Sequence, residues 1–450
     1  MATKQQQKGN LIAIIAMFFL FAMISFVTNL AAPIGTIWKN NYEWSGMLGN
    51  LMNFLAYLFM GIPAGNLLVK IGYKKTALWA MVIGIAGLAL QYLSSIVGAE
   101  TAVFNVGADA VTLNFIIYLL GAFVCGFCVC MLNTVVNPML NLLGGGGNKG
   151  NQLIQTGGAL NSLSGTMTPL FVGSLIGMVT AQTSMSDVAP LLWIAMGVFA
   201  FAFIVLSFVV IPEPHMNKGG KKVKYSHSPW NFRHTVLGVI GIFFYVGIEI
   251  GIPGMLNFYL ADSSASGIMV NASAVAGAVV AIYWLLMLVG RLLSSAISGA
   301  VSSRVQLIFV SALAILLIIA AIFLPDSIRV SMPGYSATDG FTMAEVPMKA
   351  LLFVLCGLCT SVMWGGIFNL AVEGLGKYTA QASGIFMMMV VGGGVMPVIQ
   401  NAIANAAGYM ASYWLVVAML AYLLFYGLVG SKNVNTDIPV EEDTVDPLNL

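Results

Sequence analysis

The chain has 450 residues, of which 59% are hydrophobic and only 8% are charged, with a formal net charge of +2. Soluble globular proteins carry about 25% charged residues, so this composition excludes a soluble domain and predicts a polytopic membrane protein. The small net charge says little about partners, and no nucleic-acid partner is predicted. The sequence lacks a G-x-x-x-x-G-K-[ST] phosphate-binding loop, so ATP is not the expected energy source.

Twelve apolar runs are long enough to cross a bilayer, because a helix needs about 20 apolar residues to span the hydrocarbon core. They cover residues 11–38, 46–69, 76–98, 110–140, 152–180, 188–211, 234–260, 272–298, 305–324, 348–373, 379–408 and 411–430. The first run is too long for a signal peptide and lacks a small-residue cleavage site, so we expect it to be the first span.

Basic residues predict the orientation of these spans, because lysine and arginine concentrate in cytoplasmic loops. With alternating spans, 15 of the 18 basic residues fall on one side, and only Lys39, Arg329 and Lys349 fall on the other. Both termini are therefore predicted to be cytoplasmic. Arg291 is counted among the 15, and we expect it to pair with a loop acid or with lipid headgroups near the end of its span.

The longest basic polar segment follows the sixth run and divides the spans six plus six. We therefore predict an N-terminal six-helix bundle over residues 1–211 and a cytoplasmic linker over residues 212–233. A C-terminal six-helix bundle is expected over residues 234–432. The polar, acidic segment 433–450 is expected to be a disordered tail.

The two halves also repeat one another in short patterns at similar offsets. Asn137 corresponds to Asn369, Gly144 to Gly376, residues 165–169 to residues 393–397, and Asn29 ahead of Pro33 to Glu249 ahead of Pro253. Together these patterns favour a parallel repeat about an axis along the membrane normal, the arrangement of major facilitator transporters.

Five segments carry more specific motifs. They are GNLLVKIGYKKT at 65–76, AYLFMGIPAG at 56–65, LNTVVNPML at 132–140, ALNSLSG at 159–165 and IFNLAVEGLGKYTAQASGIFMMMVVGGGVMP at 367–397. The first resembles the loop after helix 2 in the major facilitator superfamily, and the others resemble its bacterial fucose and glucose/galactose permeases. The resemblance implies an all-α membrane fold of 12 helices in two pseudo-symmetric bundles. It also implies a sugar porter of the inner membrane, usually proton-driven and monomeric.

Glu249 is the one acid near the centre of a long apolar run. A carboxylate there costs roughly 2.5–3.5 kcal/mol on insertion scales, so a functional role is the first hypothesis. Glu249 either couples transport to H+ or Na+, or accepts hydrogen bonds from sugar hydroxyls without changing protonation. The related family keeps a coupling carboxylate in helix 1, and the resemblance places Asn29 at that position, where an amide cannot titrate.

Polar and aromatic residues near mid-span are the candidate sugar ligands, because unpaired polar groups in a membrane must face a cavity or one another. The predicted substrate-binding residues are Asn29, Tyr57, Asn133, Asn161, Glu249, Asn257, Tyr283, Trp284 and Trp364. Asn53, Asn137, Asn369 and Tyr245 are further candidates. The alternative for the amides is hydrogen bonding between helices, and the alternative for the aromatic rings is packing.

The resemblance also compares one helix position by position. It places Asn161 at a family asparagine and Gly158 at the family glutamine three residues before it. Gln155 lies six residues before Asn161, and would replace that glutamine only if the helix contained an insertion.

The predicted function is secondary active transport of a monosaccharide by alternating access, coupled to H+ or Na+, and not catalysis. An uncoupled sugar facilitator and an exporter of a lipid or other amphiphile stay open as alternatives. Apart from the coupling ion, no cofactor and no metal site are predicted. The five cysteines all lie in apolar runs and are interpreted as buried helix residues rather than as a redox or zinc motif.

Overall fold

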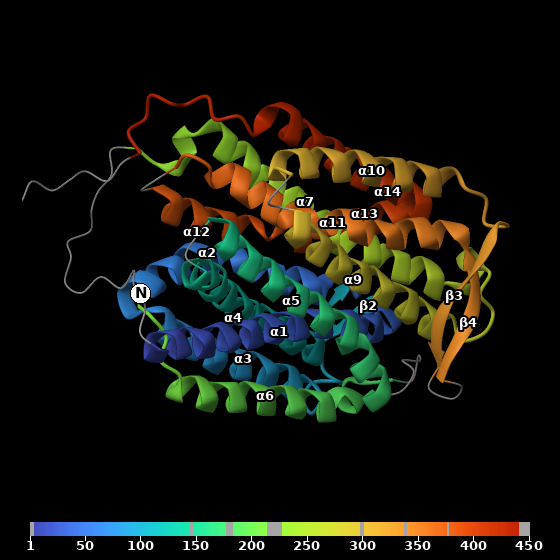
Figure 1. Cartoon of the computed structure of the whole chain (residues 1–450). Coiled ribbons are helices and arrows are strands. Elements are labelled where there is room, and N and C mark those ends of the chain that lie inside the picture. Colours follow the sequence, from blue (N-terminus) through green and yellow to red (C-terminus); the bar gives the residue numbers. More distant parts are fainter. Residues whose placement is uncertain are drawn as a thin grey trace, which may run out of the picture.

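Long helices packed side by side make up most of the computed structural model, which describes residues 4–144, 147–176, 183–213, 227–297, 301–336, 340–375 and 378–440 (Figure 1). Each of the twelve predicted apolar runs coincides with helical structure. The all-α prediction is therefore confirmed.

The first half of the chain contributes six long helices. They are α1 (Lys4–Asn41), α2 (Leu48–Ile71), α3 (Tyr73–Ser94), α4 (Leu113–Leu143), α5 (Gly147–Ile176) and α6 (Ala189–Phe208). Within this set α3 packs against α4 and α6, α2 packs against α4, and α1 packs against α5 and α4. Short 3-10 helices cover Glu43–Ser45, Met185–Val188 and Pro229–Asn231.

The second half contributes the remaining helices. They are α7 (Arg233–Ala261), the single turn α8 (Ser263–Ser266), α9 (Ala272–Ile297), α10 (Ser303–Phe323), α11 (Met348–Val372), α12 (Thr379–Met389), α13 (Gly392–Ala407) and α14 (Tyr409–Phe425), which ends in a π-helical turn over Tyr426–Gly430. Here α10 packs against α11 and α14, α9 packs against α11 and α7, and α13 packs against α7 and α14.

Eleven helical stretches among the described residues are long and apolar enough to cross a membrane. The predicted run 152–180 is not one of them. Its helix, α5, is rich in Gly, Ser, Thr and Asn, and it lies between α1 and α9. Polar residues are tolerated there because the helix packs against other helices on both sides rather than only against lipid.

The predicted run 379–408 is interrupted at Val390–Val391, between α12 and α13. The glycine triplet 392–394 follows this break. A Cβ on Gly392 would collide with the Phe243 carbonyl of α7, and one on Gly394 would touch the Leu51 backbone of α2. Glycine therefore permits the close approach of three helices, and its poor helix propensity accompanies the break.

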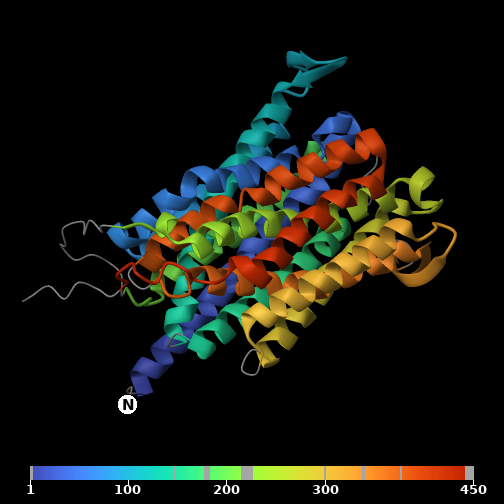
Figure 2. The ribbon, with the colours of Figure 1, turned by 90° about the horizontal axis from the view of Figure 1, so that it is seen from above.

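Two β-hairpins were not predicted from the sequence. Strands β1 (Ala102–Val106) and β2 (Asp109–Thr112) join α3 to α4, and β3 (Arg329–Ser336) and β4 (Gly340–Pro347) join α10 to α11. Each hairpin therefore precedes the fourth long helix of its half. Both lie at the end of the molecule opposite the N-terminus (Figure 2). We call this the hairpin end, and the opposite end the terminal end.

The two helix sets meet along two seams, where α5 contacts α9 and where α2 contacts α12 and α13. In the second seam the Asn50 amide nitrogen donates to the Gly393 carbonyl at 2.8 Å. Pro397 has no N–H to offer the carbonyl four residues earlier, so Asn50 supplies the missing donor. At the hairpin end the Lys39 amine lies 3.8 Å from the centroid of the Phe258 ring, which links α1 to α7.

Described residues inside the predicted linker and the predicted tail make specific contacts, so the expectation of a disordered tail is wrong for residues 433–440. The Glu213 carboxylate accepts from the backbone N–H of Tyr73 at 2.5 Å and of Lys74 at 2.9 Å, at the N-terminus of α3. Ile438 and Val440 pack on a small buried cluster around Phe232. Linker residues 214–226 and tail residues 441–450 lie outside the described residues, and the domain boundaries stay a prediction.

Candidate functional site

A cavity lies between the two helix sets, near the middle of the molecule. It encloses roughly 930 Å³, including the open volume at its mouth, and is lined from α1, α2, α4 and α5 on one side and from α7, α9 and α11 on the other. Val390, at the break between α12 and α13, completes the wall. Both helix sets therefore contribute to one central site.

Seven of the nine predicted ligands line this cavity. They are Asn29, Tyr57, Asn133, Asn161, Glu249, Trp284 and Trp364. The first half contributes neutral amides and a phenol, whereas the second half contributes a carboxylate and two indole rings. The cavity thus offers hydroxyl-binding groups on one wall and flat apolar rings on the other.

Tyr283 does not line the cavity. It is fully buried, its hydroxyl lies 2.9 Å from the Thr360 Oγ1, and it also donates to the Glu249 carbonyl at 3.4 Å. That carbonyl has no helical donor, because Pro253 lies four residues later and lacks an N–H. Tyr283 therefore satisfies the backbone of α7, and its structural role explains why it is unavailable as a ligand.

Asn257 also lies outside the cavity lining, half-buried on α7. It is eight residues beyond Glu249 toward the hairpin end, a rise of about 12 Å along the helix. It is therefore separated from Glu249 along the helix and also by about 80° around it.

The prediction for Arg291 is wrong. Its guanidinium forms an ion pair with Glu249, at 3.3 Å between Arg291 Nη2 and Glu249 Oε1, and the two side chains are only 11% and 15% exposed. The pair lies in the central cavity, because α9 packs against α7 and presents Arg291 to the α7 carboxylate. The available signal was an arginine and an acid in two otherwise uncharged apolar runs, which favours mutual pairing.

Arg291 also contacts the first half of the chain. Its Nη1 donates to the Gly158 carbonyl at 2.5 Å and to the Ser162 hydroxyl at 2.9 Å, both on α5. A Cβ on Gly158 would already lie 3.4 Å from the guanidinium. A side chain as long as glutamine would therefore compete with Arg291 for the same space, which gives a physical reason for glycine at this position.

Gln155 and Asn137 line the cavity as well, and Gln155 is buried. Gln155 and Asn161 share the cavity although they lie six residues apart on α5. Gln155 thus lines the cavity although α5 is a continuous helix without the insertion on which its replacement of the family glutamine depended. Asn369 and Tyr245 are not among the lining residues.

The amides of the first half are held by hydrogen bonds. The Asn133 amide nitrogen donates to the Tyr57 hydroxyl at 2.8 Å, which joins α4 to α2, and Asn161 donates to the Phe21 carbonyl of α1 at 3.1 Å. Asn29 instead donates within its own helix, to the carbonyl of Ser25 at 2.8 Å. Asn133 and Asn161 therefore both line the cavity and form a hydrogen bond to a neighbouring helix.

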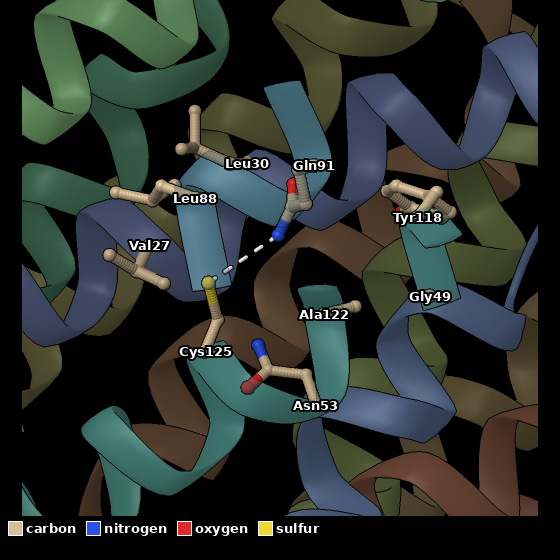
Figure 3. A pocket seen from close by; sticks show the side chains of 9 residues that line it. All are labelled: Val27, Leu30, Gly49, Asn53, Leu88, Gln91, Tyr118, Ala122 and Cys125. Carbon is tan, nitrogen blue, oxygen red and sulfur yellow. Dashed lines mark hydrogen bonds between the residues drawn. The ribbon is translucent and has the colours of Figure 1, made fainter. Parts of the chain in front are cut away.

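A second, much smaller cavity lies inside the first helix set (Figure 3). It is lined from α1 to α4, and Gln91 donates to the Cys125 sulfur across it at 3.4 Å. Asn53 faces this cavity rather than the central one. The Asn53 amide oxygen and the Tyr118 hydroxyl have no partner within the described part of the chain. The space suits about one water molecule and is too small for a sugar.

All five cysteines are free and buried, as interpreted from their apolar surroundings. Among the described residues, no group of three or more His, Cys, Asp or Glu side chains gathers as a metal site would require.

Membrane-length helices in two sets around a shared polar cavity define a multi-pass membrane carrier. The family model of the Major Facilitator Superfamily matches residues 13–396, and the chain belongs to this family of transporters rather than of enzymes. A glucose/galactose transporter of Brucella abortus is 30% identical over 422 residues, 93% of each chain. The Escherichia coli L-fucose-proton symporter is 22% identical over 441 residues, 91% of this chain and 90% of the relative.

The fold agrees with these relatives. A crystal structure of the E. coli fucose:proton symporter matches with a TM-score of 0.69 at 17% identity, over 93% of this chain and 98% of that one. The resemblance to fucose and glucose/galactose permeases is confirmed, and so is the major facilitator fold.

Proposed function

We propose that this protein is a secondary active transporter that moves a monosaccharide across the bacterial inner membrane by alternating access. The observation that carries the proposal is the central cavity, where amides of one half face indole rings and a carboxylate–guanidinium pair of the other. Amide and acid groups suit sugar hydroxyls, and aromatic faces suit the C–H surface of a sugar ring. The names of the two relatives support a hexose or deoxyhexose as substrate.

The proposed ligands divide between the walls. Asn29, Asn133 and Asn161, with Tyr57 holding Asn133, bind hydroxyl groups, and Trp284 and Trp364 stack on the ring. Asn257 and Tyr283 are not part of this set, because they do not line the cavity.

We propose Glu249 as the coupling residue for H+ or Na+. It is the one acid among the described residues that line the cavity, and its ion pair with Arg291 changes net charge when the carboxylate takes a proton or a sodium ion. The name of the fucose-proton relative supports H+ as the ion to test first.

The orientation of the proposed transporter has both termini in the cytoplasm. When Arg291, which is buried in the cavity, is left out, the other basic residues still divide 14 to 3 between the two sides. We propose that the protein works as a monomer.

The experiment is uptake of labelled D-galactose and D-glucose into proteoliposomes with an imposed pH or Na+ gradient. We expect the wild type to accumulate sugar uphill, and Glu249→Gln to equilibrate sugar without accumulating it. Uphill uptake that persists in the variant would exclude Glu249 as the coupling residue. Absence of uptake of both sugars would exclude D-galactose and D-glucose as substrates.

An uncoupled sugar facilitator is the second candidate. The neutral Asn29 favours it, because this residue stands where related permeases keep a coupling acid. A wild-type protein that equilibrates sugar under every gradient, and never concentrates it, would establish this second function.

A further inference from the structure

Arg291 belongs to the second helix set but forms two of its three hydrogen bonds with the first. One amino group of its guanidinium is held by Gly158 and Ser162 on α5, and the other faces Glu249 on α7. The α5–α9 seam is one of the two places where the helix sets meet. Arg291 therefore contacts both the proposed coupling carboxylate and the surface along which the two halves join.

The guanidinium is buried, so its charge depends on these few partners. A buried cation that loses its counter-charge is costly, because the remaining neutral acceptors do not replace the carboxylate. No other acid is among the described residues that line the cavity, so none can replace Glu249 as the counter-charge of Arg291. Arg291 on α9 and Tyr245 on α7 are the charged or titratable groups acting on it most strongly, and α11 contributes Ser361 and Trp364 to the cavity.

We propose that Arg291 is a positioning residue that links the charge of Glu249 to the α5–α9 seam. When Glu249 is neutralised, Arg291 depends more strongly on Gly158 and Ser162, and it must gain further acceptors from water or sugar hydroxyls. The seam between the two helix sets therefore responds to the charge of the carboxylate. The role of this link in transport depends on the proposed function, whereas the link itself does not.

The first test needs no sugar. Melting temperatures of the purified protein are measured for Glu249→Gln, Ser162→Ala and the double variant, first with Arg291 and then in an Arg291→Gln background. Glu249 and Ser162 both bond to Arg291. With Arg291 present, we expect the double variant to melt at least about 2 °C below the sum of the single effects. With glutamine at position 291, the effects should add within about 1 °C.

Ser164→Ala is the matched control. Its hydroxyl is also on α5, but it donates to the Ala22 carbonyl of α1 at 2.8 Å, within the first half of the chain. Its effect should add to that of Glu249→Gln in both backgrounds. Additive effects for Ser162 with Arg291 present, or equal non-additivity in the Arg291→Gln background or for Ser164, would overturn the proposed link.

The second test uses D-galactose in proteoliposomes. Arg291→Lys keeps the charge but loses the planar fork that reaches two partners at once. We expect gradient-driven accumulation to fall at least about 10-fold further than counterflow exchange, since the carboxylate keeps a cation but the seam loses its link. A parallel fall of both activities would show a structural role only. If the wild type transports neither D-galactose nor D-glucose, the proposed function fails for these two sugars, and the melting cycle still decides the link.

Discussion

Each half has a helix at the central cavity that carries a polar residue four positions before a proline, and the two helices treat this polar residue differently. In α1, Asn29 lies four residues before Pro33 and donates to its own helix at Ser25. In α7, Glu249 lies four residues before Pro253 and reaches a neighbouring helix to pair with Arg291. The repeat thus preserves the proline position, whereas the charge is present only in the second half.

This difference has a physical consequence. A neutral amide can be satisfied by the nearest carbonyl, so the surroundings of Asn29 need no other charged residue. A carboxylate inside the membrane needs a counter-charge, so α9 must supply Arg291 at the matching depth. Glu249 therefore depends on a charged partner from another helix, whereas Asn29 is satisfied within its own helix. Four predictions follow this comparison, from the largest effect to the smallest.

Removing the acid should cost far more stability than removing the amide. Glu249→Ala leaves Arg291 as an unpaired buried cation, and we expect a loss of about 3 kcal/mol in unfolding free energy. Asn29→Ala removes bonds within one helix, and we expect a loss of about 1 kcal/mol. Thermal unfolding in detergent measures both. The double variant Glu249→Gln/Arg291→Gln should recover most of the stability, and equal costs for the two alanine variants would remove the basis of the comparison.

Asn29→Asp tests whether the first half can be made like the second. A carboxylate at position 29 would have no arginine as its ion-pair partner, so it would take up a proton more readily than a paired acid. In Glu249→Gln, the added acid is expected to restore gradient-driven accumulation to at least about one tenth of wild type, a penalty near 1.4 kcal/mol. Uptake of D-galactose under a pH gradient measures this. Asn29→Ser is the control, and restoration by serine would show that charge is not the cause.

The sequence predicted the central cavity well, because a polar side chain in an apolar run is costly unless it faces a cavity or a partner. This argument found Asn29, Asn133, Asn161 and Glu249. It could not decide how far along its helix a residue lies from the cavity, and Asn257 does not line the cavity. It could not decide helix phase either, because Tyr283 and Trp284 are neighbours in sequence but differ by about 100° around the helix. One contacts the backbone of α7 and the other lines the cavity.

The remaining differences concern partners that come from distant segments. Arg291 meets Glu249 only because α9 packs against α7, which no local pattern records. The two hairpins were missed because their strands, of at most eight residues, are far shorter than the run of about 20 apolar residues on which the span predictions depended. The break at residues 390–391 depends on how closely α7 and α2 approach the glycine triplet, which is also a property of packing.

Variants of Tyr57 and Tyr283 test which tyrosine supports sugar binding and which supports the fold. Tyr57→Phe removes the hydroxyl that holds Asn133 in the cavity, so sugar affinity should fall by about 5-fold, equivalent to about 1 kcal/mol. Tyr283→Phe removes a donor to the Glu249 carbonyl and should lower stability by about 1 kcal/mol, with affinity within about 2-fold. Binding of D-galactose and thermal unfolding, measured on both variants, separate these effects. The reverse pattern would place Tyr283 in the site.

The two helices also differ where they end. After α7, the Asp262 carboxylate accepts from the Ser264 hydroxyl at 2.6 Å and caps α8, whereas after α1 the 3-10 helix at Glu43–Ser45 begins at Tyr42 without a side-chain cap. The bond from Ser264, followed by its backbone N–H and that of Ala265, lowers the pKa of Asp262 below its usual range. A carboxyl with a lowered folded-state pKa stabilises the protein above its unfolded pKa of about 3.9, and this contribution disappears as the pH falls through the lower folded-state value.

Asp262→Asn should therefore lose about 0.5 kcal/mol at pH 7, and the deficit should shrink below pH 4. Thermal unfolding from pH 3 to pH 7 measures it, with Asp187→Asn, at the 3-10 helix before α6, as the control outside this comparison. A deficit that stays constant with pH would show that the carboxylate charge does not stabilise this cap.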